Sequence, residues 1–426
     1  MFKRLLQMKL EEYVRRYFKT HADVKLVVVT GSVGKTSTKV AIGTVLAERF
    51  RIRLHEGNHN ADLSAPLAIL GVKYPDNIRS VSAWRTVFRA AKQRIAEPSD
   101  VDVIVQEVGS DRIGQVPHIR RYLRPDIAVV TAVSPEHMEY FGTIDAVAAE
   151  ELSVVNFSGM ALINRDDIDG RFSKLITNPN ISTYGSDDAA EYYFVQKSFG
   201  IKSGFEGTFV AKEWESPVAT SLRLLGAHSI RPAVAAGAVA VKLGMSADEI
   251  ATGMQKIRAV NGRMNVLRGQ ENTVIIDDTY NSSPLAAASA LRALYALDAP
   301  QKIAVLGSMN ELGESAVVEH EALGAECDAS QLAWVVTVGD LAEQHLAPVA
   351  RQQGCQVRSF ANAIEAGTFV HSVMEPGAAI LFKGSEGKIY LEEAVKIVLR
   401  STSDEKRLVR QSEAWLERKS AFFAKN

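Results

Sequence analysis

The chain has 426 residues, of which 46% are hydrophobic and 23% charged, a composition typical of a globular protein with about two or three domains. Its formal net charge is only −1, which argues against nucleic acid as a partner. The two cysteines, Cys327 and Cys355, have no metal or redox spacing, which favours a reducing cytoplasm, and no apolar run reaches the roughly 20 residues that span a bilayer.

Residues 1–24 are predicted to contain a basic amphipathic helix. One stripe of this helix is apolar: Phe2, Leu5, Leu6, Leu10, Tyr13, Val14, Tyr17 and Phe18. The basic side chains lie mostly elsewhere: Lys3, Arg4, Lys9, Arg15, Arg16 and Lys19. We favour a helix that docks on the body of the protein or on a partner. The alternative is peripheral contact of residues 2–19 with an anionic membrane, at its inner face.

Residues 26–39 (LVVVTGSVGKTSTK) read as a buried strand, a glycine-rich loop and the start of a helix. Such a loop binds polyphosphate, because glycines let backbone N–H groups close around the anion. Lys35 is expected to neutralise the β- and γ-phosphates, and the Thr36 hydroxyl to bind magnesium. The loop is shorter than the usual G-x-x-x-x-G-K-[ST] pattern, and the alternative is a plain connecting turn. The predicted phosphate-binding residues are Gly31, Ser32, Gly34, Lys35, Thr36 and Ser37.

Further along, strand-like segments alternate with helical ones, which predicts a mostly parallel α/β sheet. Strands are expected at 101–110, 125–137 and 161–167, hairpin material at 185–225 and helix at 226–257. Segment 85–94 (RTVFRAAKQR) reads as an additional basic helix.

Two polar side chains follow these strands, at the sheet edge where ligands of parallel sheets bind. Glu107 ends the first strand and His137 follows the second. Each alone fits a surface carboxylate or a hydrogen-bonded turn residue. Together with the phosphate loop, they predict a site for a divalent metal.

A domain boundary is expected near residue 260, within the polar segment 259–273. It separates a central phosphate-binding domain at 25–260 from a second α/β domain at 261–426. The strands of the second domain are expected at 274–278, 302–308, 334–340 and 378–385, and its charged tail from residue 404 as a helix.

Several stretches between residue 30 and about 398 resemble the Mur ligase family, ATP-dependent enzymes that form amide bonds in cell-wall synthesis. IDDTYNSSP and LGSMNELGE are the most specific, and GNHNADLSAPLAILG, SPEHMEYFG, NGRMNVL and LFKGSEGK occur in family order with them. The match is best to the branch that adds D-alanyl-D-alanine. The resemblance implies an α/β fold, with a P-loop central domain of mostly parallel sheet followed by a Rossmann-like C-terminal domain.

The resemblance also implies a ligase that uses ATP and Mg²⁺. A small-molecule acceptor carboxylate attacks ATP to form an acyl phosphate, and an amino acid or a dipeptide such as D-Ala-D-Ala then displaces phosphate. The implied catalytic residues are Lys35, Glu151 and Arg263, and the implied metal ligands are Thr36, Glu107, His137 and Glu151. Nucleotide contacts beyond the loop are implied for Asn164, Arg263, Asp278, Tyr280 and Asn281. Substrate contacts are implied for Asn58, Asn60, Lys383 and Ser385.

The chain departs from the family pattern in several places. Glu386 replaces the arginine of the family's K-G-S-R motif, which reverses a charge near the site implied for the dipeptide carboxylate. Glu151 stands where the family has a carbamoylated lysine, so it either supplies that anion directly or is a plain first-turn glutamate. Two asparagines of a family nucleotide motif are absent around His228. The phosphate loop also begins near residue 30, whereas the family has a UDP-binding domain before it. The rival readings are therefore a ligase on a non-UDP acceptor, as in folylpolyglutamate synthases, and a nucleotide-binding scaffold that has lost ligation.

Overall fold

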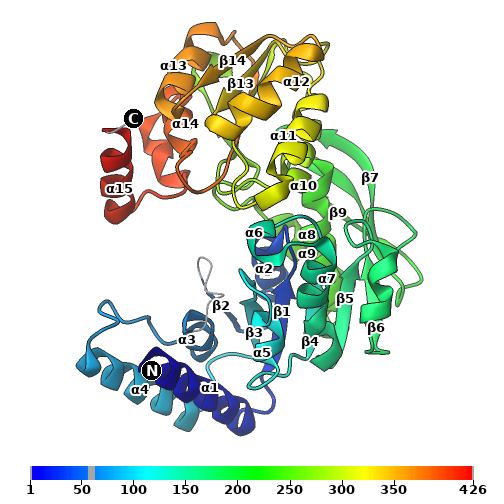
Figure 1. Ribbon diagram of the computed structural model, residues 1–426. Helices are drawn as coiled ribbons and strands as arrows, with labels where there is room; N and C mark the ends of the chain where they lie inside the picture. The colour runs from blue at the N-terminus through cyan, green and yellow to red at the C-terminus, as the bar shows by residue number, and fades with distance from the viewer. Residues whose placement is uncertain (1, 56–62, 425–426) are drawn as a thin grey trace. The chain divides into compact units, whose positions relative to one another are not determined.

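The computed structural model describes residues 2–55 and 63–424 (Figure 1). The chain forms two compact units, which are described separately. The first contains residues up to 134, 143–223 and 230–258, and the second contains 135–142, 224–229 and 259–426. Both have α/β folds with mostly parallel sheets, which confirms the expected fold class. The domain limits of 25–260 and 261–426 stay a prediction.

The first unit contains a nine-stranded sheet in the order β2-β3-β1-β4-β5-β6-β7-β8-β9. Neighbouring strands from β2 to β7 are parallel, and β7, β8 and β9 are antiparallel, as the hairpin pattern at 185–225 predicts. The central strands read as continuous apolar runs because both of their faces are buried. The strands are β1 Lys25–Thr30, β2 Ile52–Leu54, β3 Val103–Glu107, β4 Ile127–Val130, β5 Met160–Asn164, β6 Ile181–Tyr184, β7 Tyr192–Gly200, β8 Gly204–Ala211 and β9 Val218–Leu222.

Helix α2 follows the glycine-rich loop and packs against α8 and α9. The expected helix at 226–257 is two helices, separated by a turn at Gly244, whose φ of 78° suits glycine. The helices of the first unit are α1 Phe2–Thr20, α2 Lys35–Leu46, α3 Ser64–Leu70, α4 Val81–Ala96, α5 Gln115–Ile119, α7 Ile144–Leu152, α8 Ile230–Lys242 and α9 Ala247–Lys256.

The N-terminal helix α1 (Phe2–Thr20) packs on α3 and α4, which confirms the docked interpretation. Its buried apolar side chains are Leu6, Leu10, Tyr13, Val14 and Tyr17. The expected single apolar stripe is wrong at its start, because Phe2 and Leu5 are exposed. Only the part of the stripe that faces α3 and α4 is buried.

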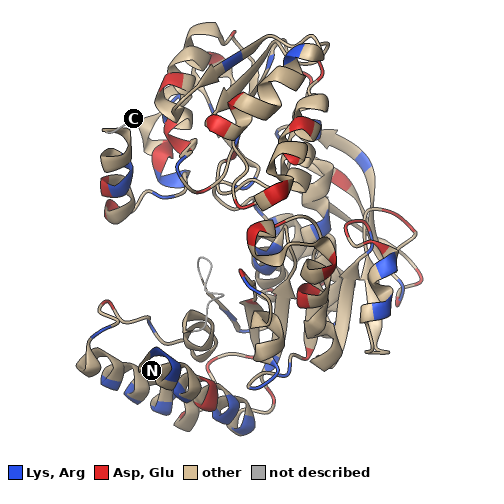
Figure 2. Cartoon of the chain, viewed as in Figure 1, with Lys and Arg blue, Asp and Glu red and all other residues tan. Residues whose placement is uncertain are grey.

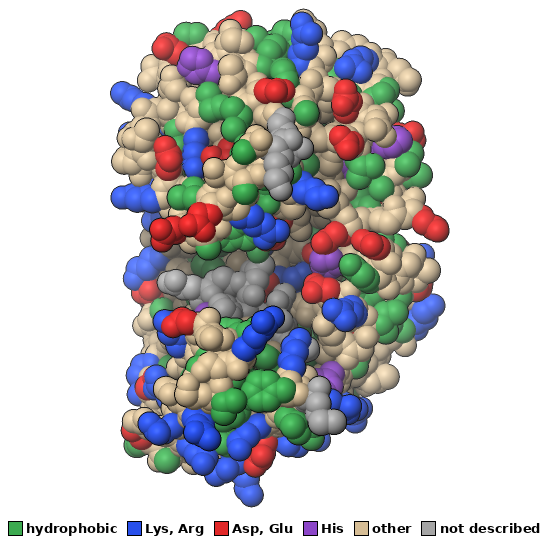
Figure 3. All heavy atoms as spheres, turned by 60° about the vertical axis from the view of Figure 1, so that its left-hand side comes forward, with side chains coloured by type: hydrophobic (Ala, Val, Ile, Leu, Met, Phe, Trp, Pro, Cys, Tyr) green, Lys and Arg blue, Asp and Glu red, His purple; other side chains and the backbone are tan. Residues whose placement is uncertain are grey.

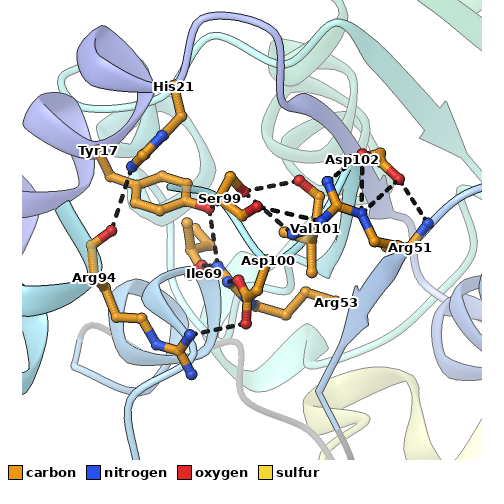
Figure 4. A network of polar contacts seen from close by, with 10 residues as sticks. All are labelled: Tyr17, His21, Arg51, Arg53, Ile69, Arg94, Ser99, Asp100, Val101 and Asp102. Atoms are coloured by element: carbon orange, nitrogen blue, oxygen red, sulfur yellow. Dashed lines mark hydrogen bonds and ion pairs between the residues drawn. The ribbon is translucent and has the colours of Figure 1, made fainter. Parts of the chain in front are cut away.

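A polar network fixes the end of α1 to the sheet (Figure 4). The Tyr17 hydroxyl lies 3.1 Å from Ser99 Oγ, and Arg53 donates to the Ile69 carbonyl at 2.7 Å and pairs with Asp100. Arg94 of α4 binds the other oxygen of Asp100 at 2.8 Å. These contacts join α1, α4 and the neighbouring β2 strand into one body.

The second unit contains a six-stranded sheet in the order β10-β11-β15-β12-β13-β14, with only β10 antiparallel to its neighbour. Helices α13 and α14 cover an apolar core that includes Val305, Val336 and Phe382. The strands are β10 Asn265–Arg268, β11 Val274–Asp278, β12 Lys302–Gly307, β13 Trp334–Val338, β14 Val357–Phe360 and β15 Ala379–Lys383. The helices are α6 Met138–Phe141, α10 Pro284–Tyr295, α11 Ala316–Ala325, α12 Ala347–Gln352, α13 Ala363–Val373, α14 Glu392–Val398 and α15 Glu413–Phe423.

The charged tail is not the single helix that its sequence suggests. A 3₁₀ turn at Thr402–Arg407 precedes α15, and Arg410 between them bonds to Glu392 of α14 at 2.7 Å. Lys419 of α15 reaches the same carboxylate at 3.3 Å. Contacts with the buried Glu392, rather than the helical periodicity of the tail's own sequence, therefore position the tail. Among the described residues, no helix is both long and apolar enough to cross a membrane.

Candidate functional site

The glycine-rich loop is held in shape by the chain that follows β4. Gly31 has φ of 125°, and a Cβ there would come within 2.7 Å of the Ala132 nitrogen, so a side chain is excluded. Ser32 donates its N–H to the Ala132 carbonyl at 2.9 Å, and its hydroxyl accepts the N–H of Ser134 at 3.0 Å. Gly34, with φ of 86°, ends the loop. The loop therefore has the curvature that a phosphate cradle requires.

Lys35 is the first residue of α2, and its side chain folds back over the loop. Its ammonium donates to the carbonyl of Gly31 at 2.5 Å and to that of Ser32 at 3.2 Å. The positive charge thus lies directly at the cradle, beside the N-terminus of α2, where an anion is stabilised by free N–H groups and the helix dipole.

Thr36 and Glu107 come together because β3 pairs with β1, which places Val29 opposite Glu107. The Thr36 hydroxyl donates to Glu107 Oε1 at 3.3 Å. Glu107 Oε2 is buried and makes no hydrogen bond to a described residue, although Lys39 Nζ lies 3.3 Å from it. A hydroxyl and an incompletely bonded carboxylate at a phosphate loop are donors that suit Mg²⁺, which prefers one or two protein oxygens plus phosphates and water.

Glu151 lies at the loop, and its neighbour Glu150 does not. Both are buried in the last turn of α7, so the expectation of a first-turn glutamate is wrong. Glu151 Oε2 accepts the Thr30 hydroxyl and, at 2.8 Å, the N–H of Gly31. Glu150 instead accepts the N–H groups of Gly114 and Val116 at the start of α5, each at 2.7 Å. The anion expected from the position of the family lysine is therefore next to the loop, while its role in binding metal stays a prediction.

Asn164 ends β5 on the same sheet edge. Its amide donates to the Thr131 carbonyl at 2.6 Å and to Asp167 at 2.8 Å. Arg231 of α8 binds that carboxylate at 2.6 Å, yet burial still raises the pKa of Asp167. Asn164 thus supports the Thr131 segment behind the loop, and direct contact with nucleotide stays a prediction.

His137 belongs to the second unit, where α6 begins. Its backbone is left-handed, with φ of 50°, and its Nδ1 lies 2.8 Å from Glu311 Oε2. The hydrogen bond with the imidazole lowers the pKa of Glu311. A carboxylate on one ring nitrogen orients the other nitrogen, an arrangement common behind metal-binding histidines. Glu311 was not among the predicted site residues, although the LGSMNELGE motif contains it.

The second unit places Asp278 beside Lys383, because parallel strands β11 and β15 pair these two residues at their carboxyl ends. The two side chains form a buried ion pair at 2.7 Å, and Lys383 also donates to the Asn281 carbonyl at 2.7 Å. The family resemblance implies a nucleotide contact for Asp278 and a substrate contact for Lys383, so the structure joins two residues that were expected to act apart. Burial raises the pKa of the adjacent Asp277 to about 6.

The remaining predicted residues of the second unit flank this pair. The Arg263 guanidinium stacks on the Tyr280 ring, 4.2 Å from its centre. Ser385 is buried, and its hydroxyl accepts the N–H of Asn310 at 2.9 Å. Asn58 and Asn60 lie outside the described residues, and Ser37 follows Thr36 in the first turn of α2.

The described residues contain no group of three or more His, Cys, Asp or Glu side chains gathered as a metal centre. Lys39, which the sequence did not single out, is the buried cation of the first unit's site. Lys39 lies one helical turn after Lys35 on α2, and this spacing in the sequence is the feature that indicates a place at the same site. The two units thus present two clusters, one around the loop and one around the Asp278–Lys383 pair.

Two family models match the chain: the Mur ligase middle domain over residues 29–240, and the Mur ligase glutamate ligase domain over residues 262–386. The UDP-N-acetylmuramoyl-tripeptide–D-alanyl-D-alanine ligase of Bacillus subtilis (strain 168) is 26% identical over 410 residues, with 92% of this chain and 79% of that protein covered. The enzyme of the same name from Escherichia coli (strain K12) is 27% identical over 328 residues, covering 76% of this chain and 66% of that protein.

Among solved structures, the MurF ligase of Thermotoga maritima in complex with ADP shares the fold, with a TM-score of 0.73. It is 22% identical, and the match covers 97% of this chain and 84% of that one. Residues 1–28, which include α1, lie outside both matched family ranges.

Proposed function

The chain belongs to the Mur ligase family, and we propose that it is an ATP- and Mg²⁺-dependent ligase that joins a carboxylate to an amine through an acyl phosphate. The observation that carries this proposal is the loop cluster: Lys35 folded over a phosphate cradle, with Thr36 and Glu107 in contact beside it. That arrangement supports phosphoryl transfer. Membership of the Mur ligase family is the reason for proposing a carboxylate as the group that receives the phosphoryl group.

Each residue has a role in this proposal. Lys35 neutralises charge on the transferring phosphoryl group, and backbone N–H groups of the loop orient it. Thr36 and Glu107 would hold Mg²⁺, and the ion would supply charge stabilisation when bound. His137 and Glu151 stay predicted as further ligands. In the second unit, Arg263 and Tyr280 are proposed to contact the nucleotide.

Lys383 of the Asp278–Lys383 pair is proposed to serve the amine substrate, while Asp278 orients it and stays a predicted nucleotide contact. Because Lys383 is already neutralised by Asp278, it acts as a hydrogen-bond donor of fixed direction rather than as a free positive charge. The related enzymes are named for a UDP-N-acetylmuramoyl-tripeptide and D-alanyl-D-alanine, so these are the first substrates to test. A cytoplasmic reaction in peptidoglycan precursor synthesis is the setting that this proposal implies.

The test is phosphate release from ATP, measured with each substrate alone and with both. We expect release that requires both the acceptor carboxylate and the amine, and its loss in Lys35→Ala. Tripeptide acceptors without the UDP group, and folate with glutamate, serve as the rival substrate pairs. If none of the substrate pairs causes phosphate release, and the chain still binds ATP, the chain is a nucleotide-binding scaffold instead.

A further inference from the structure

Helices α1 and α4 form one continuous surface of the first unit. Lys9 Nζ lies over the Phe88 ring, 5.1 Å from its centre, and Tyr13 packs edge-on against the same ring at 5.8 Å. Farther along both helices, Nε2 of His21, the residue after α1, lies 3.3 Å from the Arg94 carbonyl of α4. Contacts that advance together in this way show that the two helices run in the same direction.

The outer side of this helix pair is strongly basic (Figure 2). On α1, six Lys or Arg residues are exposed against a single exposed acid, Glu12. On α4, Arg85, Arg89 and Lys92 are exposed, and the helix contains no acidic residue. Their spacing of three or four residues aligns them along one side of α4.

Several of these cations have no counter-ion within the described part of the chain. Arg85, Arg89 and Lys92 form no ion pair there, and Arg15 of α1 forms none either. The positive charges of these four residues therefore do not stabilise the fold through ion pairs. The whole chain has a net charge of −1, so this concentration of positive charge is local.

Exposed apolar side chains lie at one end of the same surface. Phe2, Leu5 and Met8 of α1 are 48%, 59% and 57% exposed, and Val81 of α4 is 55% exposed. Phe2 and Val81 each precede the contacting residues Lys9 and Phe88 by seven positions, roughly 10 Å of helix, so both lie at the same level. Figure 3 shows hydrophobic side chains among the Lys and Arg side chains on the lower part of the molecule, where these helices lie.

We propose that this basic helix pair, α1 with α4, binds the surface of an anionic lipid bilayer. Lysine and arginine are attracted to acidic headgroups, and exposed Phe, Leu and Met side chains enter the headgroup region. Nucleic acid accounts for the charge but not for the apolar end, which has no role on a phosphate backbone. The site differs from the one the sequence suggested, because the buried stripe of α1 is occupied by α3 and α4 and the opposite side is available.

The test is co-sedimentation of the full chain with vesicles of phosphatidylcholine containing about one third phosphatidylglycerol. Each cation near an anionic surface strengthens binding about fivefold, so Arg85→Gln/Arg89→Gln/Lys92→Gln is expected to weaken it about a hundredfold. Leu5→Ser/Met8→Ser is expected to weaken it separately. The matched control, Arg351→Gln/Arg400→Gln/Lys406→Gln, removes three exposed cations of the second unit and should bind as the parent does.

Three results would overturn the proposal: no binding of the parent chain to these vesicles, equal loss in the control triple variant, or tighter binding of a fluorescent RNA duplex that Leu5→Ser/Met8→Ser leaves unchanged. Circular dichroism and thermal melting confirm that each variant is folded. The proposal does not depend on ligase activity, and none of these substitutions is in the loop cluster. A failed ligase assay therefore leaves the vesicle result interpretable, and the reverse also holds.

Discussion

Replacing Glu151 by glutamine tests whether its carboxylate serves the chemistry or only the fold. Glu151 accepts hydrogen bonds from the Thr30 hydroxyl and the Gly31 N–H. A neutral amide oxygen still accepts them, but each bond loses the assistance of the negative charge, about 1 kcal/mol apiece. We therefore expect Glu151→Gln to lower the free energy of unfolding by about 2 kcal/mol, measured by urea denaturation.

The matched control is Glu150→Gln. Glu150 is the preceding residue, is equally buried and also accepts two hydrogen bonds, from Gly114 and Val116. Its stability loss should be similar, and its turnover close to that of the parent. Turnover of Glu151→Gln, followed by phosphate release at saturating substrates, should fall about 100- to 1000-fold, the usual effect of removing one preorganised polar group from an active site.

Nucleotide affinity separates electrostatics from loop collapse. Removing a negative charge beside the phosphate cradle should leave the Kd for ATP unchanged or lower it. If Glu151→Gln instead weakens ATP binding in proportion to turnover, the carboxylate merely shapes the loop. Near-normal turnover of Glu151→Gln, or an equal loss in Glu150→Gln, would refute the reasoning.

Three further predictions concern the second unit. Burial raises the pKa of Asp277 to about 6. Its contribution to the free energy of unfolding, about 3 kcal/mol, is therefore present below about pH 4 and is lost as the pH rises through 6. Asp277→Asn should remove this pH dependence from urea unfolding curves. Lys383→Met leaves the Asp278 carboxylate without its ion-pair partner and should lower the free energy of unfolding by about 3–5 kcal/mol. Most of that loss should be recovered in Asp278→Asn/Lys383→Met. A loss in the double variant equal to the sum of the two single losses would contradict the ion-pair account. Glu311→Gln should raise the Mg²⁺ concentration needed for half-maximal turnover about tenfold, through weaker orientation of His137, and an unchanged Mg²⁺ dependence counts against that role.

Local sequence predicted the parts of the site that depend on chain neighbours. The cradle from Gly31 to Thr36 follows from a strand, two glycines with positive φ and a helix start, all readable within a few residues. Glu107 was placed at the sheet edge because it ends an apolar strand, and β3 does pair with β1 there. Sequence pattern and backbone geometry agree at these positions.

Contacts between distant segments were not predictable in the same way. Pairing of Asp278 with Lys383 requires the strand order β11-β15-β12, which no local pattern reveals. The different orientations of Glu150 and Glu151 depend on where α5 and the loop lie around α7. The apolar stripe of α1 was overestimated for a related reason: periodicity gives a helix face, and only packing on α3 and α4 determines how much of that face is covered.

The central claim is that ATP activates a carboxylate, and isotope transfer tests it most directly. The acceptor is prepared with oxygen-18 in its reacting carboxylate and incubated with ATP, Mg²⁺ and the amine. Attack of that carboxylate on the γ-phosphate, followed by displacement by the amine, leaves one labelled oxygen in the released phosphate. The account predicts labelled phosphate in equal amount to the new amide, by mass spectrometry. Amide formed with unlabelled phosphate, or phosphate released without amide, would contradict it.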